Sequence, residues 1–212
     1  MPPSWVDPSG ARPEANSPVG AAQPKVDGAA AHWIALSYDR AAPEYEARFG
    51  ATQMAKFGCV LAWPEVRQRL TGSVLDLGCG PGLLWQYVRR QLGLEPGDLD
   101  GWVGADLSAN MISLAREQGL RSIQADAAAL FFADQAFDLV LAFTSLALLP
   151  GRARLEVAES LRVLRPGGLL AATVLAKESD AFREAVEAAS GRICREVRCG
   201  QDMAFLAVRA ST

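Results

Sequence analysis

Between Ala31 and Leu70, apolar and aromatic residues recur every three or four positions, which is typical of amphipathic helices. Tyr38 and Tyr45 belong to one such series, and Pro43 and Pro64 interrupt the pattern. Because proline ends or kinks a helix, this segment should form two or three short helices. We expect these helices to form a lid in front of the main fold.

After this segment the pattern changes to short apolar stretches that alternate with amphipathic segments of about ten residues. The stretches expected to be strands are Ser73–Leu77, Trp102–Ala105, Ser122–Gln124, Phe137–Phe143 and Gly168–Leu175. The expected helices are Leu83–Leu92, Ser108–Gly119, Ala153–Val163 and residues 180–190. Two final stretches, Arg192–Arg198 and Met203–Arg209, alternate in polarity about Gly200 and predict an antiparallel hairpin.

Strands that alternate with helices predict an α/β fold with a parallel sheet between two helical layers. With the hairpin added, this doubly wound, mostly parallel sheet should have seven strands, including one antiparallel edge strand. Six of the twelve prolines lie in residues 1–30, so this stretch should form neither a helix nor a sheet core. We therefore expect a flexible Pro/Ala-rich tail (1–30), a helical lid (31–70) and an α/β core (71–212).

The composition argues against several kinds of partner. A net charge of -3 with only three lysines gives no clustered positive surface for nucleic acid. One histidine and four cysteines without a C-x-x-C pair argue against a metal site, and the cysteines should be reduced thiols. The chain starts without a secretory signal, and its longest apolar run, Leu169–Ala176, is far shorter than the roughly 20 residues that span a bilayer. These features predict a cytoplasmic protein with no membrane partner.

The first expected strand of the core leads into a glycine-rich turn, Val74–Gly82 (VLDLGCGPG). Gly78, Gly80 and Gly82 allow the backbone to turn sharply and to approach a ligand without obstruction by side chains. In open α/β sheets, ligands bind at the carboxyl ends of the strands. The turn therefore predicts a ligand site, although glycines alone are weak evidence for which ligand binds.

Three aspartates, Asp76, Asp106 and Asp126, lie at the ends of three successive expected strands. A carboxylate after the second strand can accept both hydroxyls of a ribose, and one after the third can accept the amino group of an adenine. Each aspartate alone could be a helix cap or a turn residue, but together they outline a slot for a nucleoside. NAD fits this slot less well, because the G-x-G-x-x-G motif needs a glycine where the chain has Leu83.

The same residues carry a resemblance to a known family. Val74–Gly82, Asp106, Asp126, Phe137–Phe143 (FDLVLAF) and Leu164–Gly168 (LRPGG) together resemble the class I methyltransferases that depend on S-adenosylmethionine (SAM). Tyr38–Phe49 (YDRAAPEYEARF) is similar to the lead-in helix of the branch that contains ubiquinone-biosynthesis and many small-molecule methyltransferases. The resemblance covers residues 35–210, and the combination of motifs is very specific. It implies a Rossmann-like core, SAM as the cofactor and S-adenosylhomocysteine (SAH) as its product.

The resemblance also implies roles for individual residues. The methionine moiety of SAM would be held by Asp76 and by the loop Gly78–Gly82, which includes Cys79 and Gly80, with the backbone carbonyl of Phe143 facing the ammonium group. The ribose and adenine would be bound by Asp106, Leu107, Met111, Asp126 and Ala127. Tyr38 and Tyr45 would close the carboxylate end, or they are ordinary core aromatics of an amphipathic helix. The candidates for a catalytic role are Tyr38, Tyr45 and Ser145.

Methyl transfer from a sulfonium is an in-line displacement that depends on positioning and needs no metal. The chain lacks both the N/D-P-P-Y/F motif after its fourth strand and a P-C nucleophile motif, so nucleobase methylation is not expected. Aromatic residues in 31–70 suit an apolar or aromatic acceptor, or they simply pack the lid on the sheet. We expect methyl transfer to an oxygen or nitrogen of a small molecule. The alternatives are a methyltransferase of a protein or tRNA side group and a non-catalytic SAM-binding partner protein.

Overall fold

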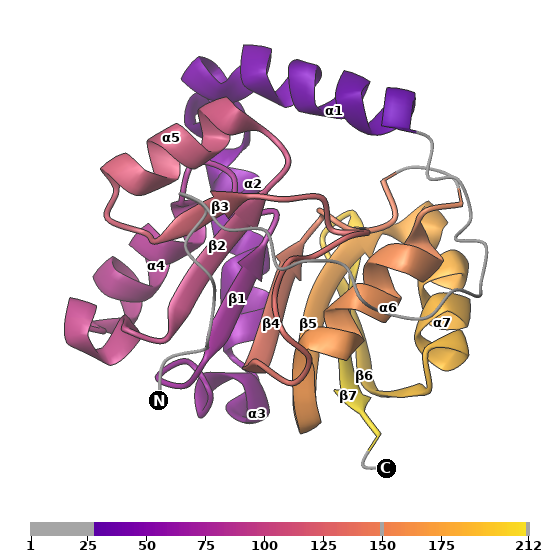
Figure 1. Cartoon of the computed structure of the whole chain (residues 1–212). Helices are drawn as coiled ribbons and strands as arrows, with labels where there is room; N and C mark the ends of the chain where they lie inside the picture. The colour runs from indigo at the N-terminus through magenta and orange to yellow at the C-terminus, as the bar shows by residue number, and fades with distance from the viewer. Residues whose placement is uncertain (1–27, 149–150, 211–212) are drawn as a thin grey trace, which may run out of the picture.

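Seven strands form one sheet in the order β3-β2-β1-β4-β5-β7-β6 (Figure 1). The computed structural model describes residues 28–148 and 151–210, so most of the expected tail lies outside the described residues. The strands are β1 (Val74–Leu77), β2 (Trp102–Asp106), β3 (Ser122–Gln124), β4 (Phe137–Phe143), β5 (Leu164–Leu175), β6 (Gly191–Cys199) and β7 (Asp202–Arg209).

The pairing of the strands confirms a mostly parallel, seven-stranded sheet with one reversed strand. β1 to β5 pair in parallel, whereas β7 runs antiparallel to both β5 and β6. The reversed strand lies between β5 and β6, because the β6–β7 hairpin folds back so that its second strand joins the sheet. β5 begins at Leu164, earlier than expected, and its register shifts before Leu169 pairs with Leu139. Pro166 and Gly167 lie in this irregular piece, which explains why no continuous apolar stretch marks it.

The helices begin close to the expected positions. They are α1 (Gly28–Ala41), α2 (Tyr45–Leu61), α3 (Pro64–Arg67), α4 (Leu83–Leu92), α5 (Ala109–Glu117), α6 (Ala153–Val163) and α7 (Ser179–Ala188), with three short 3-10 turns at Ala42–Glu44, Pro96–Leu99 and Ala176–Glu178. α1 begins inside the segment that we expected to be tail. The sequence did not indicate this start, because the first residues of the helix, Gly and Ala, show no hydrophobic periodicity. None of the helices in the described part of the chain is both long and apolar enough to cross a bilayer.

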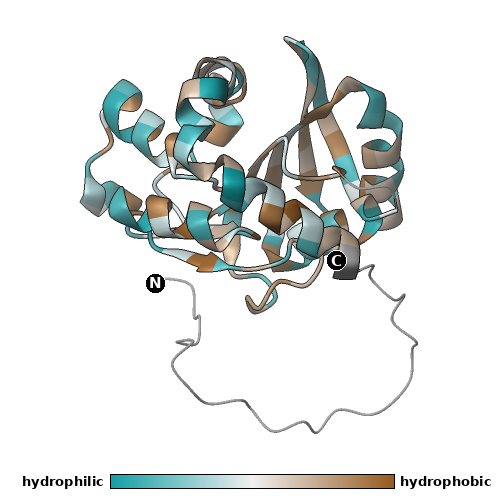
Figure 2. Ribbon diagram, turned by 90° about the horizontal axis from the view of Figure 1, so that it is seen from above, coloured by the Kyte–Doolittle hydropathy of each residue, from teal (hydrophilic) through white to brown (hydrophobic). Residues whose placement is uncertain are grey.

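Helices cover both faces of the sheet and create two hydrophobic cores. Since side chains alternate along a strand, Leu75 and Leu77 of β1 join the core under α6 and α7, whereas Val74 joins the core under α2 to α5. Figure 2 shows that the helices carry both hydrophilic and hydrophobic residues, as this arrangement requires. The doubly wound arrangement leaves the ends of the strands as the place for a ligand site.

α1 lies across the top of the molecule, above α5 (Figure 1). The Asp39 carboxylate on α1 accepts hydrogen bonds from the Ser108 hydroxyl and from the Asn110 backbone N–H. The Ser108 Oγ accepts in turn from the Met111 N–H at 3.1 Å, as the N-cap of α5. α1 is therefore attached to the first turn of α5, directly beside the carboxyl end of β2.

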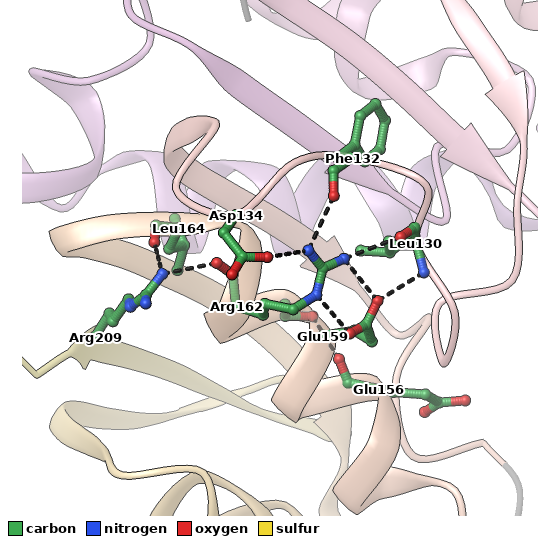
Figure 3. Close-up of polar contacts among 9 residues, drawn as sticks. Leu130, Phe132, Asp134, Glu156, Glu159, Arg162, Leu164 and Arg209 are labelled. Carbon is green, nitrogen blue, oxygen red and sulfur yellow. Dashed lines mark hydrogen bonds and ion pairs between the residues drawn. The ribbon is translucent and has the colours of Figure 1, made fainter. Parts of the chain in front are cut away.

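A second polar cluster fixes the connection between β3 and β4 (Figure 3). The Arg162 guanidinium on α6 donates to the carbonyls of Leu130 and Phe132, each at 2.9 Å, and forms ion pairs with Glu159 and Asp134. Glu159 accepts the Leu130 N–H at 2.8 Å. One arginine thus satisfies several backbone groups of a loop that has no regular structure, which holds this loop on α6.

Candidate functional site

A pocket opens at the carboxyl ends of β1, β2 and β4, below α1. This is the end of an open parallel sheet at which ligands bind. Its lining is Ala31, Ile34, Tyr38, Tyr45, Leu77, Gly78, Gly80, Ala105, Asp106, Leu107, Met111, Ala125, Asp126, Ala127, Phe143, Thr144, Ser145, Leu148, Arg152 and Glu156. The fold therefore brings together most of the residues that the sequence singled out.

Asp76, Cys79 and Gly82 do not line this pocket. Asp76 and Cys79 border a smaller cavity next to it. A Cβ at Gly82, which has φ +83, would stand 3.3 Å from the Ala115 Cα, so this glycine allows α4 to pack closely on α5. The Cys79 thiol packs where a Cβ at Gly104 would be only 2.9 Å away. The contacts of Cys79 and Gly82 are packing contacts, and a cofactor role for them stays a prediction.

The Asp106 carboxylate lines the pocket and is held by two backbone N–H groups. One of its oxygens accepts the Gly80 N–H at 2.9 Å and the other accepts the Ser108 N–H at 2.9 Å. Burial raises the pKa of this carboxyl, although the amide donors oppose the shift. Each oxygen can accept more than one hydrogen bond, so the carboxylate can also receive two hydroxyls of a ligand. The backbone amides of the glycine turn and of α5 thus orient Asp106 for that contact.

The glycine turn leaves the pocket open beside Asp106. Gly80 has φ +52, and a Cβ there would meet nothing closer than the Tyr45 ring at 3.9 Å. Gly78 has φ +74, and a Cβ there would stand 2.1 Å from the Ser145 Cβ. Gly78 therefore permits close packing against the segment after β4, and Gly80 leaves room for a ligand in the pocket.

Asp126 is held by a basic residue that the sequence did not single out. The Arg152 guanidinium donates to an Asp126 oxygen that also accepts the Ala128 N–H at 2.9 Å, and it pairs with Glu156 at 3.2 Å. These contacts leave the other Asp126 oxygen for an adenine amino group. Arg152 and Glu156 lie at polar positions at the start of an amphipathic helix, and no sequence signal distinguishes such positions from a solvated helix face.

The segment after β4 forms the floor of the pocket and holds a strained backbone. Thr144 has φ +54 and Ala147 has φ +59, both in the region that favours glycine. The Thr144 hydroxyl lies in a buried network with Lys56 of α2 and Asp202 of β7, at 2.7 Å from each. The Ala147 N–H donates to Glu156 at 2.8 Å. Such strain persists only where the surroundings enforce it, and it concentrates at functional sites.

Two of the three residues proposed for catalysis, Ser145 and Tyr45, make hydrogen bonds within the chain. The Ser145 hydroxyl donates to the Leu77 carbonyl at 2.6 Å, which attaches the floor to β1. The Tyr45 hydroxyl accepts from the Gln53 amide at 3.2 Å, and burial raises its pKa to about 12. Burial also raises the pKa of Tyr38, with a contribution from Asp106. A raised phenol pKa opposes a role as a base, and a catalytic role for Tyr38, Tyr45 and Ser145 stays a prediction.

The residues present fit SAM. Asp106 and Asp126 line the pocket, and their carboxylate oxygens can accept further hydrogen bonds, as the ribose and the adenine of SAM would require. The buried Asp76 Oδ2 has no hydrogen-bond partner among the residues that the structure describes, and it lies where a methionine ammonium would need an acceptor. No group of three or more His, Cys, Asp and Glu side chains in residues 28–148 and 151–210 could hold a metal ion.

Comparisons with known proteins find methyltransferases among the proteins similar to this chain. Residues 74–168 match the family described as a methyltransferase domain. The malonyl-acyl-carrier-protein O-methyltransferase of Enterobacter lignolyticus is 36% identical over 149 residues, which cover 69% of this chain and 55% of the relative. The tRNA (carboxymethyluridine(34)-5-O)-methyltransferase of Arabidopsis thaliana is 32% identical over 150 residues, or 68% of this chain and 32% of that protein. The chain thus spans about half or less of the length of these relatives.

The fold also matches solved structures. The methyltransferase in complex with the Haloferax volcanii Trm112 activator superposes with a TM-score of 0.67 at 17% sequence identity, over 82% of this chain and 98% of that chain. A match at this low identity compares folds only. Together with the family match, it supports the resemblance seen in the sequence motifs.

Proposed function

We propose that this chain, which has the fold of class I SAM-dependent methyltransferases and matches a methyltransferase-domain family over residues 74–168, transfers the methyl group of SAM to a carboxylate oxygen of a small acid, forming a methyl ester. One observation carries the choice of acceptor: among the described residues that line the pocket, each carboxylate is paired within the chain or assigned to the nucleoside of SAM, so none is left to act as a general base. The lining includes neither histidine nor lysine.

The acidic side chains of the pocket are already engaged. Asp106 accepts two backbone N–H groups, Asp126 pairs with Arg152, and Glu156 accepts from Ala147 and Arg152. A hydroxyl or an ammonium group must lose a proton before it can accept a methyl group, whereas a carboxylic acid with a pKa near 4 is already ionised at neutral pH. A pocket without a free base therefore favours a carboxylate acceptor.

The names of the two relatives support the same class. Malonyl and carboxymethyl groups, named for the acceptors of those O-methyltransferases, each contain a carboxyl group. The acceptor in one is attached to a carrier protein and in the other to tRNA, so a carboxyl group borne by a larger molecule is an alternative acceptor. We keep the cytoplasm as the proposed location, which rests on the four free cysteines.

The work of this chain is to align the acceptor and exclude water. When bound, SAM supplies a methyl group on a sulfonium, which is already activated for displacement. α1 covers the pocket, and Leu148, Phe143 and Ile34 give it apolar walls. Holding two reactants in line contributes about 7–11 kcal/mol to such a reaction, so positioning can provide most of the acceleration.

The test is a product analysis with deuterated SAM. The full chain is incubated with acceptors that share a skeleton and differ only in the accepting group: a carboxylic acid, an alcohol, a phenol or an amine. Malonyl thioesters and fatty acids represent the carboxylic acids. Mass spectrometry should find a deuterated methyl ester, which mild alkali hydrolyses. Methylation of the phenols or amines, with the acids untouched, would overturn the proposed acceptor class.

Binding of the cofactor should release a proton from Asp76. Burial, with a contribution from Asp106, raises the pKa of Asp76 to about 8, so this carboxyl is mostly protonated at pH 7. An ammonium group beside it favours the carboxylate and lowers the pKa. The affinity for SAH should therefore rise with pH, by at most about tenfold per unit, between pH 6 and 7.5.

Calorimetry in two buffers of different ionisation enthalpy measures the released proton directly. Asp76→Asn has no proton to release, so its affinity for SAH should be flat over this range. An affinity of the parent chain that falls with rising pH would contradict the assignment of Asp76 to the ammonium group.

A further inference from the structure

A small cavity continues the main pocket beneath α2. It is bordered by the glycine turn, by Asp76 at the end of β1 and by Gln53 from α2. Tyr45, Gly78, Gly80 and Phe143 border both this cavity and the main pocket, so the two spaces are neighbours. The cavity lies where the methionine end of a ligand bound at Asp106 would extend.

Two buried oxygen atoms at this cavity have no hydrogen-bond donor in the described part of the chain. They are Asp76 Oδ2 and Gln53 Oε1. The exposed fraction is 3% for Asp76 and 9% for Gln53, so water does not readily satisfy either atom. An unpaired buried acceptor costs about 1–3 kcal/mol. Two of them at one cavity indicate a ligand that brings hydrogen-bond donors.

The Gln53 amide is oriented by a fixed contact. Its Nε2 donates to the Tyr45 hydroxyl at 3.2 Å, which leaves Oε1 as the free end of the amide. The Tyr45 ring packs against Phe49 with a centroid distance of 5.1 Å, so both residues are held within the lid. The contact with Tyr45 therefore orients the Gln53 Oε1 atom without the help of a ligand.

The ligand chemistry follows from these two acceptors. A carboxylate and an amide oxygen together suit a cation with several N–H donors, and a primary ammonium has three. We propose that Gln53 of the lid binds the ammonium group of the methionine moiety together with Asp76, so that α2 recognises the amino-acid half of the cofactor. This inference rests on the proposed function, since it takes SAM as the ligand.

The same helix connects this contact to the floor of the acceptor pocket. Lys56 follows Gln53 by three residues, on the same side of α2, and its ammonium lies 2.6 Å from Asp202 and 2.7 Å from Thr144. A displacement of α2 would therefore move both the Gln53 contact and the Thr144 contact. Recognition of the ammonium group and formation of the floor share one structural element.

The test compares two ligands that differ only in the amino-acid group. SAH carries it, whereas 5′-methylthioadenosine keeps the adenosine and the sulfur but has no ammonium. In calorimetry with the full chain, Gln53→Leu should weaken SAH about tenfold, as expected for a lost hydrogen bond to a charged group, and should leave methylthioadenosine unchanged. Gln53→Glu keeps an acceptor and should retain SAH binding. Gln86→Leu on α4, outside both cavities, is the matched control.

Each other outcome is informative. Equal loss of both ligands in Gln53→Leu would show that Gln53 supports the lid by packing and would overturn the inference. An unchanged affinity for SAH would also overturn it. If the parent chain binds methylthioadenosine as tightly as SAH, the cavity does not recognise the ammonium group. If the parent chain binds neither ligand, the proposed function itself fails, which is a separate result.

Discussion

Replacing Asp106 by alanine should weaken the binding of SAH by about 1.5–3 kcal/mol, which corresponds to roughly 10- to 150-fold in Kd. The reason is the loss of the Asp106 carboxylate, which Gly80 and Ser108 orient and which we propose accepts two ribose hydroxyls. The affinity is measured by calorimetry on the purified variant, alongside its melting temperature.

A matched control separates this effect from lost stability. Asp138 at the start of β4 also accepts a backbone N–H, from Ser73 at 3.0 Å, and pairs with Arg165 at 2.5 Å. It does not line the pocket. Asp138→Ala should therefore lower the melting temperature without changing the affinity for SAH. If the folded Asp106→Ala variant binds SAH as tightly as the parent chain, the ribose does not bind at Asp106.

Replacing Gly78 by alanine should destabilise the fold by about 2–5 kcal/mol. A left-handed φ costs a residue with a Cβ about 1–2 kcal/mol, and forcing a methyl group into a packed site costs about 1–3 kcal/mol more. Here the φ is +74 and the new Cβ would stand 2.1 Å from the Ser145 Cβ. The free energy of unfolding, measured by urea denaturation, reports the loss.

A double-mutant cycle with Ser145→Gly separates the two causes. Removing the Ser145 side chain also removes its hydrogen bond to the Leu77 carbonyl, so the single variant loses about 1 kcal/mol. In the double variant the steric part of the Gly78→Ala effect should disappear and the φ part should remain. The expected coupling energy is about 1–3 kcal/mol. Additive effects would mean that the glycine turn does not pack on Ser145.

The sequence was sufficient to place the aspartates of the site because their positions follow from the strand pattern. Parallel strands share one carboxyl end, so carboxylates near the carboxyl ends of β1, β2 and β3 must lie along one edge of the sheet. Asp106 and Asp126 do line one pocket, and Asp76 borders the adjoining cavity. The glycine turn was also predictable from the sequence. Positive φ values, such as +52 at Gly80, favour glycine, so a cluster of glycines after a strand indicates a sharp turn.

The residues of the site that the sequence did not reveal contact partners far away in the sequence, or they lie at polar positions of helices. Arg152 reaches Asp126 from the N-cap of α6, and Lys56 reaches Asp202 across most of the chain. Gln53 lies on a helix in which a buried polar side chain looks like any solvated position. Hydrophobic periodicity locates the helix axis and its buried face, but it does not tell which polar side chain meets a partner from another element. The position of β7 between β5 and β6 likewise depends on how the hairpin folds back onto the sheet, which the hydrophobic pattern does not specify.

The most direct test of the cofactor site is a calorimetric titration of the full chain with SAH and, separately, with NAD. SAH should bind one molecule per chain, because Asp106 and Asp126 offer acceptors for one nucleoside at a single pocket. NAD should give no measurable heat at the same concentrations, because the turn carries Leu83 where a dinucleotide motif needs glycine. A folded chain that binds NAD more tightly than SAH would contradict the assignment of this pocket to SAM.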